Sequence, residues 1–326
     1  MFIQQAFKAQ HQWWRYVIGI IITVFAVMIG QIPLTAAILI WGDIDPMFVT
    51  AETLYEALEP NLTMFLLLLS FAIGLVGLLF VIRFIHRQPL LEATTSRKKV
   101  DWGRFAFGFA LIAVVNILFF TVGYLVSPED YEWNFQPVPF FILFVITISM
   151  VPLQIAFEEY LFRGYLMQGL GVLARNRWFP LIVTSLIFGL LHLGNPEVGK
   201  MGEIVMLIYI GNGFMLGIMT LMDEGMELAL GYHAGNNIIA SLMLTADWTA
   251  FQGHSLFKDV SDPVVTTLEV LVQVLVFFPA ILFIMARKYK WTDWRQKLFG
   301  KVVPPPVEVP LVVEQNHLPL PHGEDQ

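Results

Sequence analysis

The hydrophobic positions of this chain gather in long blocks that are separated by polar stretches. Eight apolar segments can be drawn, each near the length of about 20 residues that a helix needs to cross a bilayer. They run Val17–Trp41, Leu62–Ile82, Phe105–Val126, Phe140–Phe162, Phe179–Leu193, Ile204–Met222, Met226–Leu244 and Val264–Ala286. The pattern predicts an all-α fold, a polytopic bundle of about eight transmembrane helices.

The segments suggest three parts of the chain. Residues 1–139 would form an N-terminal region with three spans, and residues 140–300 a helical core with the remaining spans. Within this core, hydropathy alone does not establish two segments as spans: Phe179–Leu193 is short, and Met226–Leu244 contains glycines and several polar groups. Residues 301–326 are rich in proline, which predicts a disordered tail.

Loop charges predict the orientation. The loops at 43–61 and 127–138 contain acidic residues and no lysine or arginine. Basic residues gather instead near the N-terminus, at 83–104, at 175–177 and at 287–297. Because cytoplasmic loops are enriched in lysine and arginine, we expect both termini to be cytoplasmic. The turn at Asp223–Glu224 is the one predicted inside turn without a basic residue.

Composition narrows the class of protein. Of 326 residues, 57% are hydrophobic and 14% charged, against about 25% charged in soluble domains, so the chain is an integral membrane protein. The absence of cysteine excludes a disulfide framework, a cysteine nucleophile and a thiolate zinc site. A net charge of −7 without a large basic surface gives no reason to expect nucleic-acid binding.

Three ionisable side chains interrupt the fourth apolar segment: Glu158, Glu159 and Arg163. Each costs about 2.5–3.5 kcal/mol on insertion scales, so the group needs a reason. Glu159 and Arg163 are four residues apart on one helix face and can pair, which predicts a structural or orienting role. Glu158 is rotated by about 100° from its neighbour and has no such local partner.

Later polar groups supply candidates to meet Glu158. Glu158 and His192 are equally far in sequence from Arg175, so a hairpin closing there places them at one height. His233 and Asn237 are four residues apart and project from one face. If the turn at Arg175 projects about two helical turns from the membrane, all four groups share a site on the cytoplasmic side of the midplane.

These residue types favour amide hydrolysis. A glutamate in apolar surroundings can take a proton from water, and a histidine opposite can hold that water. A His/Asn pair can donate hydrogen bonds to a developing oxyanion. Glu158, His192 and His233 also match the donors of a catalytic zinc site, although the H-E-x-x-H spacing is absent. Both the metal-free and the metal-assisted route stay open.

The ordered motifs Glu158-Glu159-x-x-x-Arg163, Phe188-x-x-x-His192 and His233-x-x-x-Asn237 resemble those of one family. This is the CAAX prenyl endopeptidase and bacteriocin-processing family, also called the abortive-infection type, of intramembrane proteases. The resemblance spans about residues 156–239. It implies that Glu158 and His192 activate water, that His233 and Asn237 form the oxyanion site, and that Glu159 and Arg163 orient them.

The family resemblance also implies further properties of the molecule. We expect a multi-pass protein of a bacterial inner membrane that acts on a peptide or lipidated protein substrate, such as a prenylated or bacteriocin-type one, in contact with membrane lipid. Family members are called metalloproteases, so a divalent metal such as zinc is a further expectation, held by Glu158, His192 and His233.

Other interpretations compete with proteolysis. Taken singly, Glu159–Arg163 is a structural pair, and His192 or Asn237 could simply bridge helices. The same groups could hold a peptide in a non-catalytic immunity or scaffold protein, or Glu158 could relay protons in a transporter. Only the joint placement of Glu158, His192, His233 and Asn237 favours the enzyme.

Overall fold

The computed structural model describes residues 1–51 and 53–304, and most of them are helical. Six helical segments in this part of the chain are long and apolar enough to cross a membrane. They are α1 (Trp13–Trp41), α3 (Pro60–Phe80) with η3 (Val81–Ile85), α5 (Trp102–Val126), α6 (Pro137–Glu159) with η5 (Tyr160–Met167) and α7 (Gln168–Ala174), η6 (Glu203–Val205) with α10 (Met206–Asp223), and α12 (Thr267–Val272) with η7 (Gln273–Phe277) and α13 (Phe278–Tyr289). The predicted helical membrane bundle is confirmed.

The number of long spans differs from the eight predicted. The segments Phe179–Leu193 and Met226–Leu244 form α8 (Trp178–Leu190), with 13 residues, and α11 (Glu227–Met243), with 17. Both are shorter than the six long segments. Most of α11 is buried against α5, α6 and α10, so other helices cover it and its polar residues need not meet lipid.

The remaining elements lie at the two ends of the bundle. The short helices are η1 (Ile3–Lys8), η2 (Pro46–Phe48), α2 (Leu54–Ala57), α4 (Leu90–Thr94), η4 (Pro128–Asp130), α9 (Pro196–Met201) and α14 (Trp294–Phe299). Strands β1 (Tyr131–Trp133), β2 (Leu244–Thr245) and β3 (Phe257–Asp259) form a small sheet in the order β1-β3-β2. The apolar pattern did not indicate this sheet.

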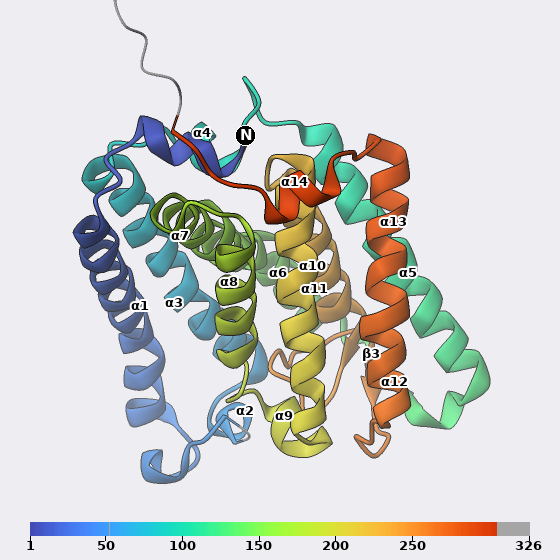
Figure 1. The fold of residues 1–326 in the computed structure, drawn as a ribbon. Coiled ribbons are helices and arrows are strands. Elements are labelled where there is room, and N and C mark those ends of the chain that lie inside the picture. The colour runs from blue at the N-terminus through green and yellow to red at the C-terminus, as the bar shows by residue number, and fades with distance from the viewer. Residues whose placement is uncertain (52, 305–326) are drawn as a thin grey trace, which may run out of the picture.

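The outer surface of the bundle is apolar. Helices α1 and α13 lie on opposite sides of the molecule in Figure 1. On α1, Ile21 and Phe25 are each 62% exposed, and Phe283 of α13 is 64% exposed. Large apolar side chains exposed around a bundle are what contact with lipid requires, so this is a membrane protein.

The predicted hairpin around Arg175 is present. Helix α6 continues through η5 and α7 to Ala174, and Arg175 then adopts the left-handed conformation with φ 54°. Helix α8 starts three residues later and runs back along the bundle (Figure 1). Glu158 and Glu159 end the regular α-helix, immediately before the π-helical turn η5. Such π-helical turns often mark functional sites in membrane and soluble helices.

Glycines bring the core helices close together. A Cβ on Gly213 would meet the backbone of Ser185 at 2.7 Å, so α10 and α8 are in direct contact there. A Cβ on Gly231 would lie 2.0 Å from the carbonyl oxygen of Phe105, and one on Gly235 2.5 Å from that of Phe109. This small-residue packing seats α11 on α5 and fixes the position of the residues between the two glycines.

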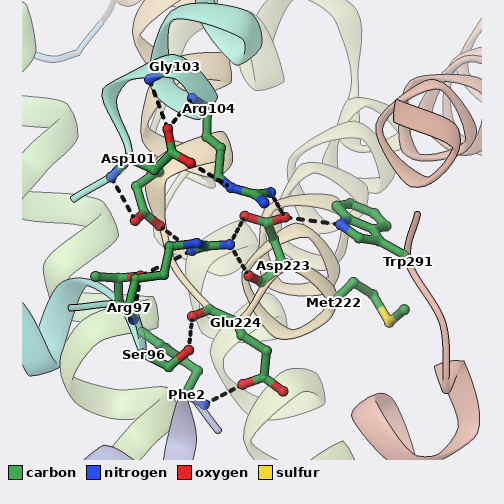
Figure 2. Close-up of polar contacts among 12 residues, drawn as sticks. Phe2, Ser96, Arg97, Asp101, Gly103, Arg104, Met222, Asp223, Glu224 and Trp291 are labelled. Atoms are coloured by element: carbon green, nitrogen blue, oxygen red, sulfur yellow. Dashed lines mark hydrogen bonds and ion pairs between the residues drawn. The ribbon is translucent and has the colours of Figure 1, made fainter. Parts of the chain in front are cut away.

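An ionic cluster fastens the turn between α10 and α11, as Figure 2 shows. Asp223 accepts hydrogen bonds from Arg97, at 2.8 Å, from Arg104, and from Trp291 Nε1, at 3.0 Å. Arg97 also pairs with Glu227 at 3.0 Å. The acidic turn therefore takes its positive charges from other segments, since Asp223 pairs with Arg97 and Arg104 and Glu224 pairs with Arg177.

The two ends of the described chain lie at the same end of the bundle as this cluster (Figure 1). Gln4 Nε2 donates to the carbonyl oxygen of Val303 at 3.1 Å, and the amide of Val302 donates to the carbonyl of Arg175. Most of the predicted disordered tail, residues 305–326, lies outside the described residues. The proposed division at residues 139 and 140 stays a prediction.

Candidate active site

One cavity of about 480 Å³ brings the predicted residues together inside the bundle. Its lining includes the four predicted catalytic residues, namely Glu158, His192, His233 and Asn237. They come from α6, from the turn that follows α8, and from α11. Side chains of α3, α9 and α10 and the segment 249–251 also line the cavity. The predicted convergence is thus present as geometry, while the roles of these residues stay predictions.

Glu158 has two polar neighbours, one of them on its own helix. Its Oε1 accepts a hydrogen bond from Gln154 Nε2 at 2.6 Å, and its Oε2 lies 3.6 Å from His233 Nε2. Gln154 in turn accepts from Asn237 Nδ2 through its Oε1 at 3.4 Å. Gln154 thus links the carboxylate to the amide on α11. Gln154 is not among the predicted site residues, although its position four residues before Glu158 is a signal visible in the sequence.

His233 lies between the two glutamates. Its Nδ1 is 2.9 Å from Glu159 Oε1, and the same oxygen accepts from Arg163 Nη1 at 2.9 Å. Glu159 and Arg163 are almost completely buried and form the ion pair that helical spacing predicts, while their structural role stays a prediction. Because a carboxylate can only accept, Nδ1 carries a hydrogen and the other ring nitrogen, Nε2, faces Glu158.

His192 lines the same cavity as Glu158 but has other contacts. Among the described residues, no hydrogen bond or ion pair joins the two side chains. His192 Nδ1 instead lies 2.7 Å from the carbonyl oxygen of Phe188, and the ring stacks on Tyr209 at 4.4 Å. The physical reason is that α8 ends at Leu190, so His192 lies in the following turn and its Nδ1 caps the helix backbone. Its Nε2 is left available to a group in the cavity.

Phe188, the phenylalanine of the second motif, packs against both histidines of the site. Its ring is 4.9 Å from the ring of His192 and 6.2 Å from that of His233. The Arg163 guanidinium lies over the same ring, 4.7 Å from its centre. Phe188 therefore separates the buried cation from the cavity and holds both imidazoles by contact with their edges and faces.

The side chains do not form a ready metal site as they stand. Within residues 1–51 and 53–304, no group of three or more His, Cys, Asp or Glu side chains is close enough to hold a metal ion. One nitrogen of His233 is directed to Glu159 and one nitrogen of His192 to a backbone carbonyl. These contacts leave Nε2 of each histidine for the cavity, as in metal-binding histidines, so the expected set of Glu158, His192 and His233 stays a prediction. The chemistry below uses no metal.

Comparisons with known proteins agree with the motifs. Residues 134–239 match the family model described as type II CAAX prenyl endopeptidase Rce1-like. The chain is also 29% identical over 248 residues to the uncharacterized protein YyaK of Bacillus subtilis strain 168, which covers 75% of this chain and 82% of that protein. No solved structure matches the chain significantly. The resemblance predicted from the sequence is confirmed, and the matched segment carries every candidate site residue.

Proposed function

We propose, from the Rce1-like match of residues 134–239 and the cavity within it, that this chain is an intramembrane endopeptidase. The observation that carries the proposal is the placement of Glu158 and His233, 3.6 Å apart, on the wall of one cavity. At that distance the two groups are not hydrogen-bonded to each other, so a water or a substrate group beside them can form hydrogen bonds with both.

In this proposal, Glu158 is the general base. It takes a proton from a water molecule held beside it with the help of His192, and the hydroxide attacks the peptide carbonyl carbon. Glu158 then gives the proton to the nitrogen of the leaving amine as the C–N bond breaks. The carboxylate is thereby restored, and no proton is gained or lost by the site.

The oxyanion formed by this attack needs hydrogen-bond donors. Asn237 Nδ2 makes only a long contact of 3.4 Å to Gln154, so it can turn to a substrate oxygen. His233 can donate through Nε2 when that nitrogen carries a hydrogen, and Glu159 at 2.9 Å from Nδ1 holds the ring in place. Glu159 and Arg163 thus act as positioning residues.

We propose the finer assignments in the same way. The substrate is a membrane-associated peptide or lipidated protein, and the site lies toward the cytoplasmic side of a bacterial inner membrane. Both ends of the described chain lie at the end of the bundle with the basic residues of 83–104 and Arg175, which supports a cytoplasmic position for both termini.

Cleavage by purified protein tests the proposal. The full chain in detergent or nanodiscs is incubated with prenylated and unmodified peptides, with and without a chelator. We expect cleavage by the wild type and none by Glu158→Gln, whose secondary structure and thermal unfolding stay unchanged. A non-catalytic scaffold would bind the peptide and leave it intact in both proteins. Loss of activity with chelator, restored by added metal, would establish the metal that the family name suggests.

A further inference from the structure

A second carboxylate, Glu197, lines the same cavity as Glu158. It belongs to the short helix α9, between α8 and α10, where neither the motifs nor the family match assigns a role. Its Oε1 accepts a hydrogen bond from the amide of Ala250 at 2.8 Å. Its Oε2 is buried and has no hydrogen-bond partner among the described residues. A buried carboxylate oxygen without a donor is unfavourable, so this atom calls for a ligand.

The charges around the cavity show what kind of ligand would fit. The ionisable side chains on its wall are Glu158, Glu197, His192, His233 and the tyrosines, with no lysine or arginine among the lining residues. The nearest cation to Glu158 on its own helix, Arg163, is directed to Glu159 and does not line the cavity. With neutral histidines the wall is therefore anionic, and it lacks a cation of its own.

Burial makes the need for a cation at Glu197 greater. Loss of solvation raises the pKa of the Glu197 carboxyl, and the Ala250 amide and His192 only partly oppose that rise. A positively charged group beside the carboxylate would offset the lost solvation.

The neighbouring wall is aromatic. Tyr209 and Phe251 line the cavity with Glu197, and the ring of Tyr209 stacks on His192 with an interplanar angle of 21°. Asn195 Nδ2 donates to the Tyr209 hydroxyl at 3.3 Å, which leaves that hydroxyl able to donate into the cavity. Aromatic faces beside a carboxylate form a common setting for an ammonium or guanidinium group.

We propose that Glu197 forms a cation subsite of this cavity, which binds a positively charged amine or guanidinium group of the substrate peptide. The cation is either a lysine or arginine side chain or a free amino terminus. The inference rests on the proposed function for the cavity being a peptide site. It adds the substrate class: peptides with a positive charge within reach of the hydrolytic centre.

Binding to a protein that cannot cleave separates this inference from the proposed function. In the Glu158→Gln background, the affinity of the full chain is measured for three fluorescent peptides that differ only at one internal residue and at the amino terminus. One carries an internal lysine and an acetylated amino terminus, the second has norleucine with a free amino terminus, and the third has norleucine with an acetylated terminus. We expect about tenfold tighter binding of one cationic peptide over the neutral one. The tighter of the two cationic arms identifies the source of the charge.

A second substitution assigns the preference to Glu197. Adding Glu197→Gln should reduce the preference to less than about twofold, whereas the matched Glu203→Gln, at an exposed residue outside the cavity, should leave it unchanged. Equal binding of all three peptides by the protein with Glu197 intact would overturn the inference. A preference for the cationic peptide that survives Glu197→Gln would overturn it too. If wild-type protein cleaves peptides without regard to charge, the subsite fails and the protease stands. If the charge preference is found and the wild-type protein cleaves none of the peptides, the subsite stands and the proposed protease activity fails.

Discussion

His233 Nδ1 lies 2.9 Å from Oε1 of Glu159, a carboxylate that is itself completely buried. This contact fixes the hydrogen of the imidazole on Nδ1 and turns Nε2 toward Glu158. The two adjacent glutamates thus have different roles. One enters the cavity, and the other holds the imidazole that faces it.

Glu159 should be needed for both folding and activity. Glu159→Ala leaves Arg163 buried without its carboxylate, so we expect a loss of about 3–5 kcal/mol of unfolding free energy. The paired Glu159→Ala/Arg163→Met protein should recover part of this loss, because no unpaired charge stays buried. Unfolding in detergent measures both. A loss below about 1 kcal/mol for Glu159→Ala would contradict the ion-pair account.

Gln154 should affect catalysis more than stability. Gln154→Met keeps the volume of the side chain but removes the hydrogen bond at 2.6 Å to Glu158 and the link to Asn237. We expect kcat/KM to fall about tenfold, or 1.4 kcal/mol, with thermal stability little changed. The matched control is Gln136→Met, at an exposed residue before α6 and outside the cavity lining. An equal effect of both substitutions would show that Gln154 does not position Glu158.

Asp223 should be a major contributor to stability at the α10–α11 turn. Asp223→Asn weakens contacts to Arg97, Arg104 and Trp291, and we expect a loss of about 2–3 kcal/mol. Asp247 makes one exposed ion pair with Lys258 at 2.8 Å, so Asp247→Asn should cost less than about 0.5 kcal/mol. Chemical unfolding of the two variants checks the contrast. Similar small losses would mean that the cluster does not hold the turn.

Glu197 should make stability depend on pH. Burial raises the pKa of its carboxyl above the ordinary value of 4.5, so the folded chain retains a proton that the unfolded chain releases. Wild-type stability should therefore fall as pH rises from 4.5 through the raised value. Because glutamine cannot ionise, Glu197→Gln should gain stability relative to wild type over that interval. Thermal unfolding of both proteins from pH 4 to pH 8 measures the difference, and parallel curves would contradict it.

The fold was largely predictable because lipid solvation imposes a strong pattern. In the part of the chain that the structure describes, six long apolar helical segments lie near the expected positions. The sequence pattern counted the two shorter helices, α8 and α11, as full spans. Hydropathy does not distinguish a span from a buried helix such as α11, whose neighbours cover its polar groups. The small sheet of β1, β2 and β3 has strands of two or three residues, too short for alternation to be recognised.

The sequence predicted which residues line the candidate site better than it predicted the contacts between them. Helical spacing located the Glu159–Arg163 pair and the face shared by His233 and Asn237. It could not show that Glu159 also binds His233, because that contact joins helices 74 residues apart in sequence. Nor could it show that His192 lies beyond the end of α8, since the end of a helix depends on packing as well as on local sequence.

The rate of peptide cleavage by Glu158→Gln, compared with wild type and with Glu203→Gln, tests the central claim most directly. Glutamine keeps the size of Glu158 and its contact with Gln154 but cannot take a proton from water. The account predicts cleavage below detection for Glu158→Gln and wild-type cleavage for Glu203→Gln, with both proteins folded. Wild-type cleavage by folded Glu158→Gln would contradict it.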